Sequence, residues 1–181
     1  DSFEVLQQRL IENRGHPDDI QVRYRDGVRQ VLGWSEKVVD GAPAEVPWKE
    51  GGVYLITGGL GGLGTLFARE ISQRGPHVTL ILVGRSKLNA KSEDVLYQLS
   101  TSGVRVEYRQ VDVSRSQEVN GLVQEINREF GVLNGILHAA GISEDNYILR
   151  KGPDEWMKVL EPKTAGTVNL DLATRDQPLD F

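Results

Sequence analysis

Residues 53–64 read Val53-Tyr54-Leu55-Ile56-Thr57-Gly58-Gly59-Leu60-Gly61-Gly62-Leu63-Gly64. An apolar run typical of a buried strand enters a cluster of glycines, and a helical pattern begins directly after it. The spacing Gly59-x-Gly61-x-x-Gly64 fits a dinucleotide-binding turn, because glycines permit the tight turn, the close approach of the backbone to a pyrophosphate and close packing of the helix on the strand. The helix N-terminus would offer free N–H groups to the phosphates. A glycine-rich turn without a ligand is the disfavoured alternative, because clustered glycines cost conformational entropy.

Strands and helices alternate from residue 51 onward. The alternation predicts right-handed β-α-β units and an α/β fold with a doubly wound parallel Rossmann sheet. Leu179-Asp180-Phe181 reads as the entry to a fifth strand, so we expect a partial sheet and a chain excised from a longer protein. The fourth strand would then form an edge, with Leu133, Ile136 and Leu137 facing solvent. The expected strands are Val53–Thr57, Thr79–Val83, Val104–Gln110 and Leu133–His138, and the expected helices are Gly62–Arg74, Ser92–Ser102, Ser116–Phe130 and Asp154–Ala173.

Residues 1–50 follow a different pattern. Apolar residues from Phe3 to Ile11 recur at helical spacing, and residues 20–25 alternate in polarity as a strand does. Asp26-Gly27 is a hairpin turn signal, after which residues 28–34 can return as a second strand. One helix and one hairpin make a poor core, so this part is expected to dock on another part of the protein. Residues 41–47 resemble a linker, and we expect two domains, 1–50 and 51–181.

The composition excludes several classes of function. The 181 residues carry a net charge of −5, which argues against a nucleic-acid partner. No apolar run is long enough to cross a membrane, so no membrane partner is expected. The sequence has no cysteine, which excludes disulfides and cysteine-based metal sites and fits a cytoplasmic location. No metal site is predicted.

The end of the second strand predicts which nicotinamide cofactor is bound. NAD-binding proteins usually place an acidic residue about 20 residues beyond the glycines, where it holds the ribose hydroxyls. This sequence instead has Gly84-Arg85-Ser86-Lys87. Arg85, together with Ser86, matches a 2′-phosphate, which favours NADPH. The alternative is that Arg85 is a solvated loop charge.

The ends of the third and fourth strands supply further candidates. Asp112, followed by Val113, could accept a hydrogen bond from the adenine amino group, or it could cap a local turn. Ser114 is the better candidate to cap the next helix. The small residues of His138-Ala139-Ala140-Gly141 would let the backbone run beside the cofactor. His138 is interpreted as a packed strand residue rather than a catalytic base, because no second histidine or carboxylate motif supports a triad or metal role.

These motifs together, with Pro162-Lys163-Thr164-Ala165-Gly166, resemble the ketoreductase domains of modular polyketide synthases, in the short-chain dehydrogenase/reductase superfamily. The resemblance covers residues 51–181. Residues 1–50 resemble the tail of the truncated structural subdomain that precedes the catalytic half in this family. Residues 144–148 resemble the same segment in synthases that use a separate, trans-acting acyltransferase.

The resemblance implies an enzyme, its partners and its cofactor. A β-ketoacyl chain, held as a thioester on the phosphopantetheine of an acyl carrier protein, is reduced to a β-hydroxyacyl chain by NADPH, in contact with the other synthase domains. A tyrosine donates the proton, a serine binds the carbonyl, and a lysine holds the nicotinamide ribose and lowers the pKa of the tyrosine. The lysine matches Lys163 on the helix after the fourth strand; without the resemblance, Lys163 would be interpreted as a surface lysine.

The resemblance also assigns residues that this chain does not contain. The family's serine and tyrosine lie downstream of Lys163, and the sequence ends before them, so no residue here takes either role and the chain alone is expected to be inactive. Tyr147 stands in the wrong motif to be the proton donor. From the residues, the cofactor site comprises Thr57 to Gly64, Arg85, Ser86, Asp112, Val113, Ala139, Ala140 and Gly141.

The residues that follow the His-Ala-Ala-Gly motif predict the stereochemistry of the product. Ketoreductases that form the D-hydroxy product resemble one another in a Leu-Asp-Asp triplet after the His-Ala-Ala-Gly motif. The corresponding residues here are Ser143-Glu144-Asp145, which keep only the last aspartate. Asp145 therefore predicts a B-type enzyme, and the alternative is a loop aspartate bonded to its own backbone.

Two other functions stay open. One is a free-standing dehydrogenase of the same superfamily, against which the N-terminal helix and hairpin argue, because single-domain members normally begin at the glycine-rich strand. The other is a non-catalytic piece that binds the cofactor or organises a larger assembly.

Overall fold

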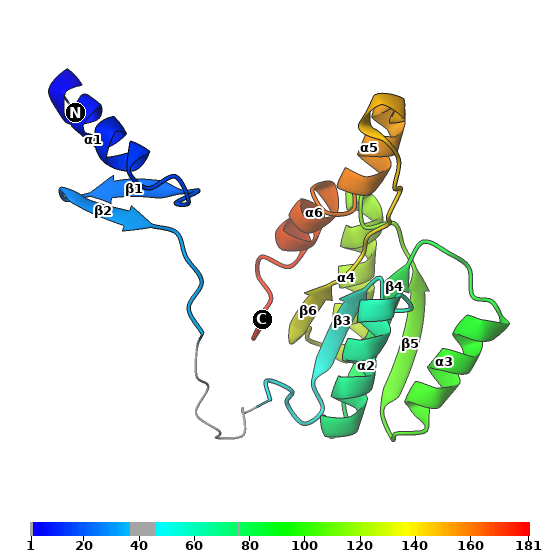
Figure 1. Cartoon of the computed structure of the whole chain (residues 1–181). Coiled ribbons are helices and arrows are strands. Elements are labelled where there is room, and N and C mark those ends of the chain that lie inside the picture. Colours follow the sequence, from blue (N-terminus) through cyan, green and yellow to red (C-terminus); the bar gives the residue numbers. More distant parts are fainter. Residues whose placement is uncertain (1, 37–45, 76) are drawn as a thin grey trace. The chain divides into compact units, whose positions relative to one another are not determined.

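The computed structural model of the chain describes residues 2–36, 46–75 and 77–181. The chain divides into two compact units, Asp1–Ala44 and Glu45–Phe181 (Figure 1). Each unit is described by itself. The expected linker at 41–47 lies largely outside the described residues. The role expected for residues 1–50, a structural subdomain, stays a prediction.

The first unit consists of the expected helix and hairpin. Helix α1 (Phe3–Arg14) precedes strands β1 (Val22–Arg25) and β2 (Val28–Val31), which pair antiparallel. Asp26 and Gly27 both have positive φ, as a two-residue turn between twisted strands requires. The Tyr24 hydroxyl donates to Glu12 of α1 at 2.7 Å. No residue of α1 is buried, so polar contacts hold this unit together more than a core does.

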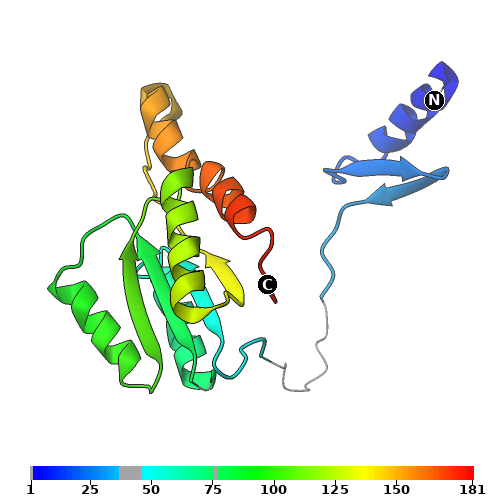
Figure 2. The same ribbon diagram turned by 180° about the vertical axis from the view of Figure 1, so that it is seen from behind.

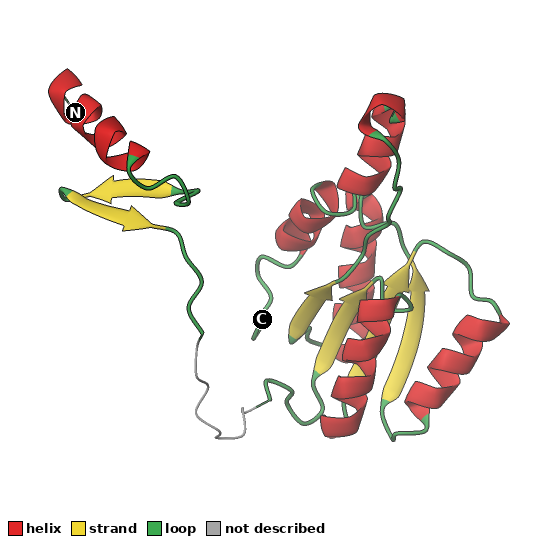
Figure 3. Ribbon diagram, in the orientation of Figure 1, coloured by secondary structure: helices red, strands yellow, loops and turns green. Residues whose placement is uncertain are grey.

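The second unit contains a four-stranded parallel sheet in the order β5-β4-β3-β6 (Figure 3). This order and the α/β fold confirm the prediction of a doubly wound Rossmann sheet. The strands are β3 (Val53–Thr57), β4 (Thr79–Gly84), β5 (Arg105–Gln110) and β6 (Gly135–His138). The helices are α2 (Gly62–Arg74), α3 (Ala90–Ser100), α4 (Ser116–Phe130), the 3₁₀ turn η1 (Ile148–Arg150), α5 (Pro153–Leu160) and α6 (Ala165–Ala173).

Helices cover both faces of the sheet (Figures 1 and 2). On one face, Leu55 and Ile81 pack with Leu122 of α4 and Leu170 of α6. On the other face, alternate residues of the same strands pack with α2 and α3. Strand β3 is buried along its whole length, as expected for the central strand of a parallel sheet. None of the helices in the described ranges is long and apolar enough to span a bilayer.

The long helix predicted at Asp154–Ala173 is wrong. Two helices stand there, and a turn at residues 161–164 separates α5 from α6. The reason is Pro162, which has no N–H to donate and whose ring clashes with a continuing helix. The Gly166 N–H instead bonds to the Glu161 carbonyl at 3.0 Å, one residue beyond the α-helical spacing.

The exposure predicted along the fourth strand is wrong at Leu133. This side chain is fully buried in the core that α4 covers, and β6 begins only at Gly135. Chain-terminal residues lie beside the strand: the Asp180 N–H donates to the Asn134 carbonyl at 2.7 Å, and the Phe181 carbonyl accepts from Ile136 at 3.2 Å. Ile136 and Leu137 are also half-buried rather than exposed, and Leu137 packs against the core on the face that α2 and α3 cover.

Candidate cofactor and active site

The glycine turn holds its shape because three of its glycines, Gly58, Gly59 and Gly64, have no room for a side chain; a Cβ on Gly59 would lie 2.7 Å from Leu82 Cβ. Gly58 has φ of +63°, and a Cβ there would lie 2.6 Å from the Ala139 carbonyl oxygen. A Cβ on Gly64, inside the first turn of α2, would overlap the Gly58 carbonyl. Small residues at 139–141 therefore let β6 and its following segment lie directly against the turn.

The remaining residues of the turn play different parts. The Gly59 N–H donates to the Val83 carbonyl at 3.2 Å, which ties the turn to β4. The Gly61 N–H donates to the Gly58 carbonyl at 2.8 Å. A Cβ on Gly62 would meet nothing within 4 Å. Leu60 packs against the core, and Leu63 is 65% exposed. The N-terminus of α2 thus opens above the turn without a capping side chain, as an anion-binding helix end requires.

Thr57 ties the end of β3 to the segment that follows β6. Its hydroxyl accepts from the Ala140 N–H at 3.2 Å, and its carbonyl accepts from Ala139 at 3.1 Å. Thr57 and His138 are register partners, and Oγ1 lies 2.6 Å from Nδ1 of the ring. The other ring nitrogen, Nε2, lies 2.8 Å from the Pro162 carbonyl, which can only accept, so Nε2 carries a proton. Both ring nitrogens are occupied, as expected of a packed strand residue.

A basic pocket of about 430 Å³ lies between the glycine turn and the end of β4. Arg85 and Ser86 line it together with Gly58 and Gly61, so the structure brings together the phosphate and ribose residues that the sequence predicted. Sequence reasoning missed Lys91, on the first turn of α3, which also lines this pocket. Among the described residues, no carboxylate lines it.

Asp112 lies at the same edge of the sheet, in a small pocket that it shares with Arg85. Its carboxylate accepts from the Ser114 N–H at 3.0 Å and from the Ser114 hydroxyl at 2.7 Å. The helix cap predicted at Ser114 is therefore wrong: the N-cap of α4 is Arg115, and Ser114 bonds Asp112 instead. Partial burial alone would raise the pKa of Asp112, but the bonds from Ser114 and the charges of Arg85 and Arg115 together lower it.

Because the pKa of Asp112 is lower in the folded chain than in the unfolded chain, its ionised form stabilises the fold. This stability is present above the ordinary aspartate pKa of about 3.9 and is lost as pH falls through the lower folded value. Asp112→Asn should lower the free energy of unfolding by about 1 kcal/mol at neutral pH and flatten its decline in acid. Urea unfolding at several pH values across this range measures the loss of stability and its dependence on pH, with Asp171→Asn, at an exposed position of α6, as the control. If the free energy of unfolding fell equally in acid for Asp112→Asn and for the unchanged chain, the lowered pKa of Asp112 would be contradicted.

Val113, next to Asp112, is buried under α6. Its carbonyl accepts from the Asn169 side chain at 2.9 Å, and a Cβ on Gly166 would lie 3.0 Å from its methyl group. Val113 therefore holds α6 close to the sheet, and it also lines the small pocket that contains Asp112 and Arg85.

Lys163 lies in the turn between α5 and α6, which corrects its expected place on a helix. The preceding residue, Pro162, is buried and is held by His138 through its carbonyl. The Lys163 side chain is exposed on the other side and lines a pocket of about 430 Å³ with residues 138–143. A Cβ on Gly141 would lie 3.6 Å from Lys163 Cε, so the lysine reaches the segment that leaves β6.

Asp145 is exposed and does not line the Lys163 pocket, whereas Ser143 does. One hydrogen bond joins the two ends of the loop that carries Asp145. The Lys151 ammonium donates to the Glu144 carbonyl at 2.8 Å and lies 4.8 Å from the ring centroid of Trp156. The structure therefore places Asp145 beside the site rather than inside it.

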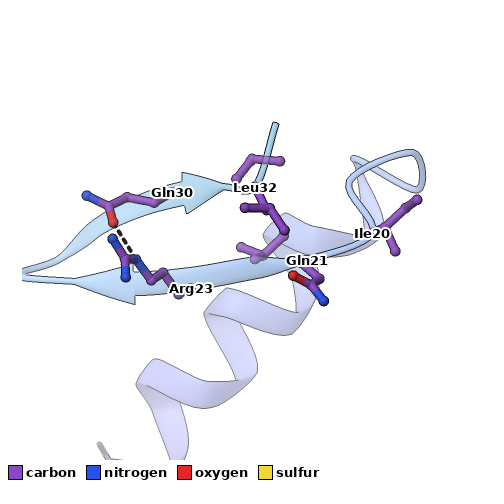
Figure 4. A pocket seen from close by; sticks show the side chains of 7 residues that line it. Ile20, Gln21, Arg23, Gln30 and Leu32 are labelled. Atoms are coloured by element: carbon purple, nitrogen blue, oxygen red, sulfur yellow. Dashed lines mark hydrogen bonds between the residues drawn. The ribbon is translucent and has the colours of Figure 1, made fainter. Parts of the chain in front are cut away.

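A separate hollow of about 840 Å³ lies on the hairpin of the first unit. Figure 4 shows Ile20 and Leu32 on it, and the dashed line marks the bond of 2.7 Å from Arg23 to Gln30. It contains none of the predicted site residues, and two of its apolar members, Ile20 and Leu32, are strongly exposed. Within the described ranges, no group of three histidine or acidic side chains could hold a metal ion.

Comparison with known proteins agrees with this geometry. A family model described as KR domain matches residues 52–181. The chain is 41% identical over its whole length to Polyketide synthase PksN and 44% identical over 99% of its length to Polyketide synthase PksL, both of Bacillus subtilis strain 168. It spans only 3% and 4% of those relatives.

A ketoreductase domain from the bacillaene assembly line superposes with a TM-score of 0.83 at 44% identity, covering 97% of this chain and 42% of that one. An N-terminal ketoreductase from the macrolactin assembly line gives 0.71 at 39% identity, covering 84% and 29%. The chain therefore belongs to the KR family, the ketoreductase domains of polyketide synthases, which have the short-chain dehydrogenase/reductase fold.

Proposed function

We propose that this chain is the cofactor-binding part of a ketoreductase that reduces a β-ketoacyl thioester to a β-hydroxyacyl thioester with NADPH. The observation that carries the proposal is the convergence of three distant parts of the sequence at one edge of the sheet. The turn at Gly58, the Arg85 loop and Lys163 all border the segment that follows β6. Parallel sheets of this kind bind nucleotides at this edge.

The pocket beside Gly58 fits a phosphorylated dinucleotide. The N-terminus of α2 provides N–H groups for the pyrophosphate, and Arg85, Lys87 and Lys91 bring positive charge to the neighbouring pocket. Since no carboxylate of the described chain lines that pocket, the ribose-binding acid typical of NAD sites is missing there. A 2′-phosphate supplies the negative charge that these cations require, which supports NADPH over NADH.

The chemical step divides between the cofactor and the protein. NADPH supplies the hydride when it is bound. Lys163 holds the nicotinamide ribose and keeps a positive charge in the pocket, which lowers the pKa of a tyrosine that lies, by the family resemblance, after Lys163. His138 holds the Pro162 carbonyl and so fixes the turn from which Lys163 projects. The small residues at 139–141 let the backbone approach the nicotinamide.

The stereochemical proposal rests on the loop at Asp145. Asp145 is exposed and lies two residues beyond Ser143, which lines the Lys163 pocket, and its carboxylate would favour a B-type, D-hydroxy product. The anchor of Lys151 on the Glu144 carbonyl limits how far this loop can move. The partners would be an acyl carrier protein with its phosphopantetheine-linked chain and the other domains of a synthase.

Turnover and product analysis test the proposal. Loss of NADPH absorbance is followed with a β-ketoacyl thioester, on this chain and on a longer polypeptide that continues past Phe181. Turnover in the longer polypeptide, with a D-hydroxy product on chiral analysis, is the expected result. NADPH binding without turnover in either would favour a non-catalytic cofactor-binding piece. Equal turnover of a free ketone and the thioester would favour a free-standing dehydrogenase, and an L-hydroxy product would refute the role of Asp145.

A further inference from the structure

Strand β5 holds the loop that follows β4 through three successive carbonyls. The Gly84 carbonyl accepts from the Val111 N–H at 3.0 Å, as in an ordinary parallel ladder. The next two carbonyls accept from side chains instead. Gln110 Nε2 donates to the Arg85 carbonyl at 2.9 Å, and the Tyr108 hydroxyl donates to the Ser86 carbonyl at 2.5 Å. Side chains thus extend the ladder beyond the point at which β4 ends.

The register of the two strands makes this possible. Tyr108 pairs with Leu82, and Gln110 pairs with Gly84, so the two side chains are two residues apart and share one face of the sheet. A Cβ on Gly84 would lie 2.9 Å from the Tyr108 hydroxyl oxygen. Gly84 therefore leaves the space through which the tyrosine reaches Ser86. The ring of Tyr108 packs on the core beneath, and burial raises the pKa of its hydroxyl, so it stays a donor at neutral pH.

A fixed carbonyl also fixes the N–H of the same peptide. The peptide unit is planar and trans, so its N–H points opposite to its C=O. With the Arg85 and Ser86 carbonyls turned toward β5, the N–H groups of Ser86 and Lys87 turn away from it. Arg85, Ser86 and Lys87 all line the basic pocket.

We propose that Tyr108 and Gln110 are specificity-determining positioning residues, which hold residues 85–87 in the conformation that binds the 2′-phosphate of NADPH. The inference rests on the proposed function, because it needs NADPH as the cofactor. Tyr108 lines the basic pocket and Gln110 does not, so contact with the cofactor is not what the two side chains share. Each acts by fixing one carbonyl, and the guanidinium of Arg85 binds the phosphate.

The experiment measures the dissociation constants of NADPH and NADH on this chain by titration. Tyr108→Phe keeps the ring and removes only the hydroxyl, and we expect it to weaken NADPH binding about fivefold, the value of one ordinary hydrogen bond. NADH binding should change less than about twofold, because NADH has no 2′-phosphate. Gln110→Met, which has similar size and no donor, should act in the same direction through the neighbouring carbonyl. Tyr97→Phe, at an exposed position of α3, is the matched control and should change neither constant.

Gly84→Ala gives an independent test of the same contact. Its methyl group would displace the Tyr108 hydroxyl, so it should reproduce the change in the NADPH-to-NADH ratio. The double variant Gly84→Ala with Tyr108→Phe should be no weaker for NADPH than Gly84→Ala alone, because both remove one bond. Additive losses would overturn the inference, as would Tyr108→Phe and Gln110→Met variants that bind NADPH and NADH with the unchanged ratio or weaken both equally.

The failure of this inference can be distinguished from the failure of the proposed function. Arg85→Ala should abolish the preference for NADPH over NADH. If the unchanged chain shows no such preference, or if Arg85→Ala keeps it, the assignment of NADPH fails and the inference fails with it. If the preference exists and depends on Arg85, but not on Tyr108 or Gln110, only the inference is overturned.

Discussion

Replacing Gly58 with alanine is expected to destabilise the second unit by about 2–6 kcal/mol, the sum of backbone strain at positive φ and overpacking. The strain arises because φ at Gly58 is +63°. The overpacking arises because the new methyl group would lie 2.6 Å from the Ala139 carbonyl oxygen and 2.9 Å from Ala140 Cα, both of them backbone atoms. Neither can be relieved by a side-chain rotation. The same displacement would move the glycine turn away from β6, so NADPH binding should also be lost.

Urea unfolding measures the first effect, and Gly62→Ala is its matched control. Gly62 is the first residue of α2, and a Cβ there would meet nothing within 4 Å. The control should therefore unfold within about 1 kcal/mol of the unchanged chain. A Gly58→Ala variant that unfolded at the same urea concentration as Gly62→Ala would show that the contact of Gly58 with Ala139 does not constrain the turn.

Replacing Lys163 with methionine should lower kcat of the longer, active polypeptide by about 10²- to 10⁴-fold, the usual contribution of general acid–base catalysis. The physical reason is electrostatic. Without the ammonium, the pKa of the proton-donating tyrosine rises toward its ordinary value near 10, so the tyrosine becomes a weaker acid. The alkaline limb of the pH–rate profile should consequently move to higher pH, which a merely structural defect would not cause.

Lys158→Met is the control for Lys163. Lys158 is also exposed and lies on α5, five residues earlier, but it does not line the pocket beside Gly141. It should keep the rate and the pH profile of the unchanged protein. Should Lys163→Met reduce β-ketoacyl thioesters at the unchanged rate, Lys163 would be a surface lysine, which is how its sequence alone would be interpreted.

Two wrong predictions, the single helix at Asp154–Ala173 and the helix cap at Ser114, overlooked local signals in the sequence. Pro162 stood inside the predicted helix, and a proline in a helical pattern normally ends or kinks it. Asp112 and Ser114 are two residues apart, the spacing at which an aspartate bonds its own backbone, so the local-turn alternative for Asp112 describes the structure without a ligand. Both signals are local, so the sequence alone contains them.

The burial of Leu133, by contrast, has no local signal in the sequence. Its solvent exposure was inferred from the order of the strands, but a buried position depends on the helix that covers it. Leu133 precedes β6 and packs with Leu122 and Ile126 of α4. The strand order was right and the side-chain environment was not, because the order of the strands says nothing about the packing above them.

The sequence by itself determined the α/β fold and the glycine turn, because each depends on patterns within a few residues: the apolar period and the glycine spacing. The order of the strands followed from that fold class rather than from a local pattern. Only the tertiary structure decided the contacts between distant segments. His138 meets the Pro162 carbonyl across 24 residues, and Tyr108 meets the Ser86 carbonyl across 22. The Tyr108 bond depends on the register of β4 and β5 and on the space that Gly84 leaves, and the His138 bond depends on the turn between α5 and α6 that carries Pro162. No local pattern encodes either arrangement.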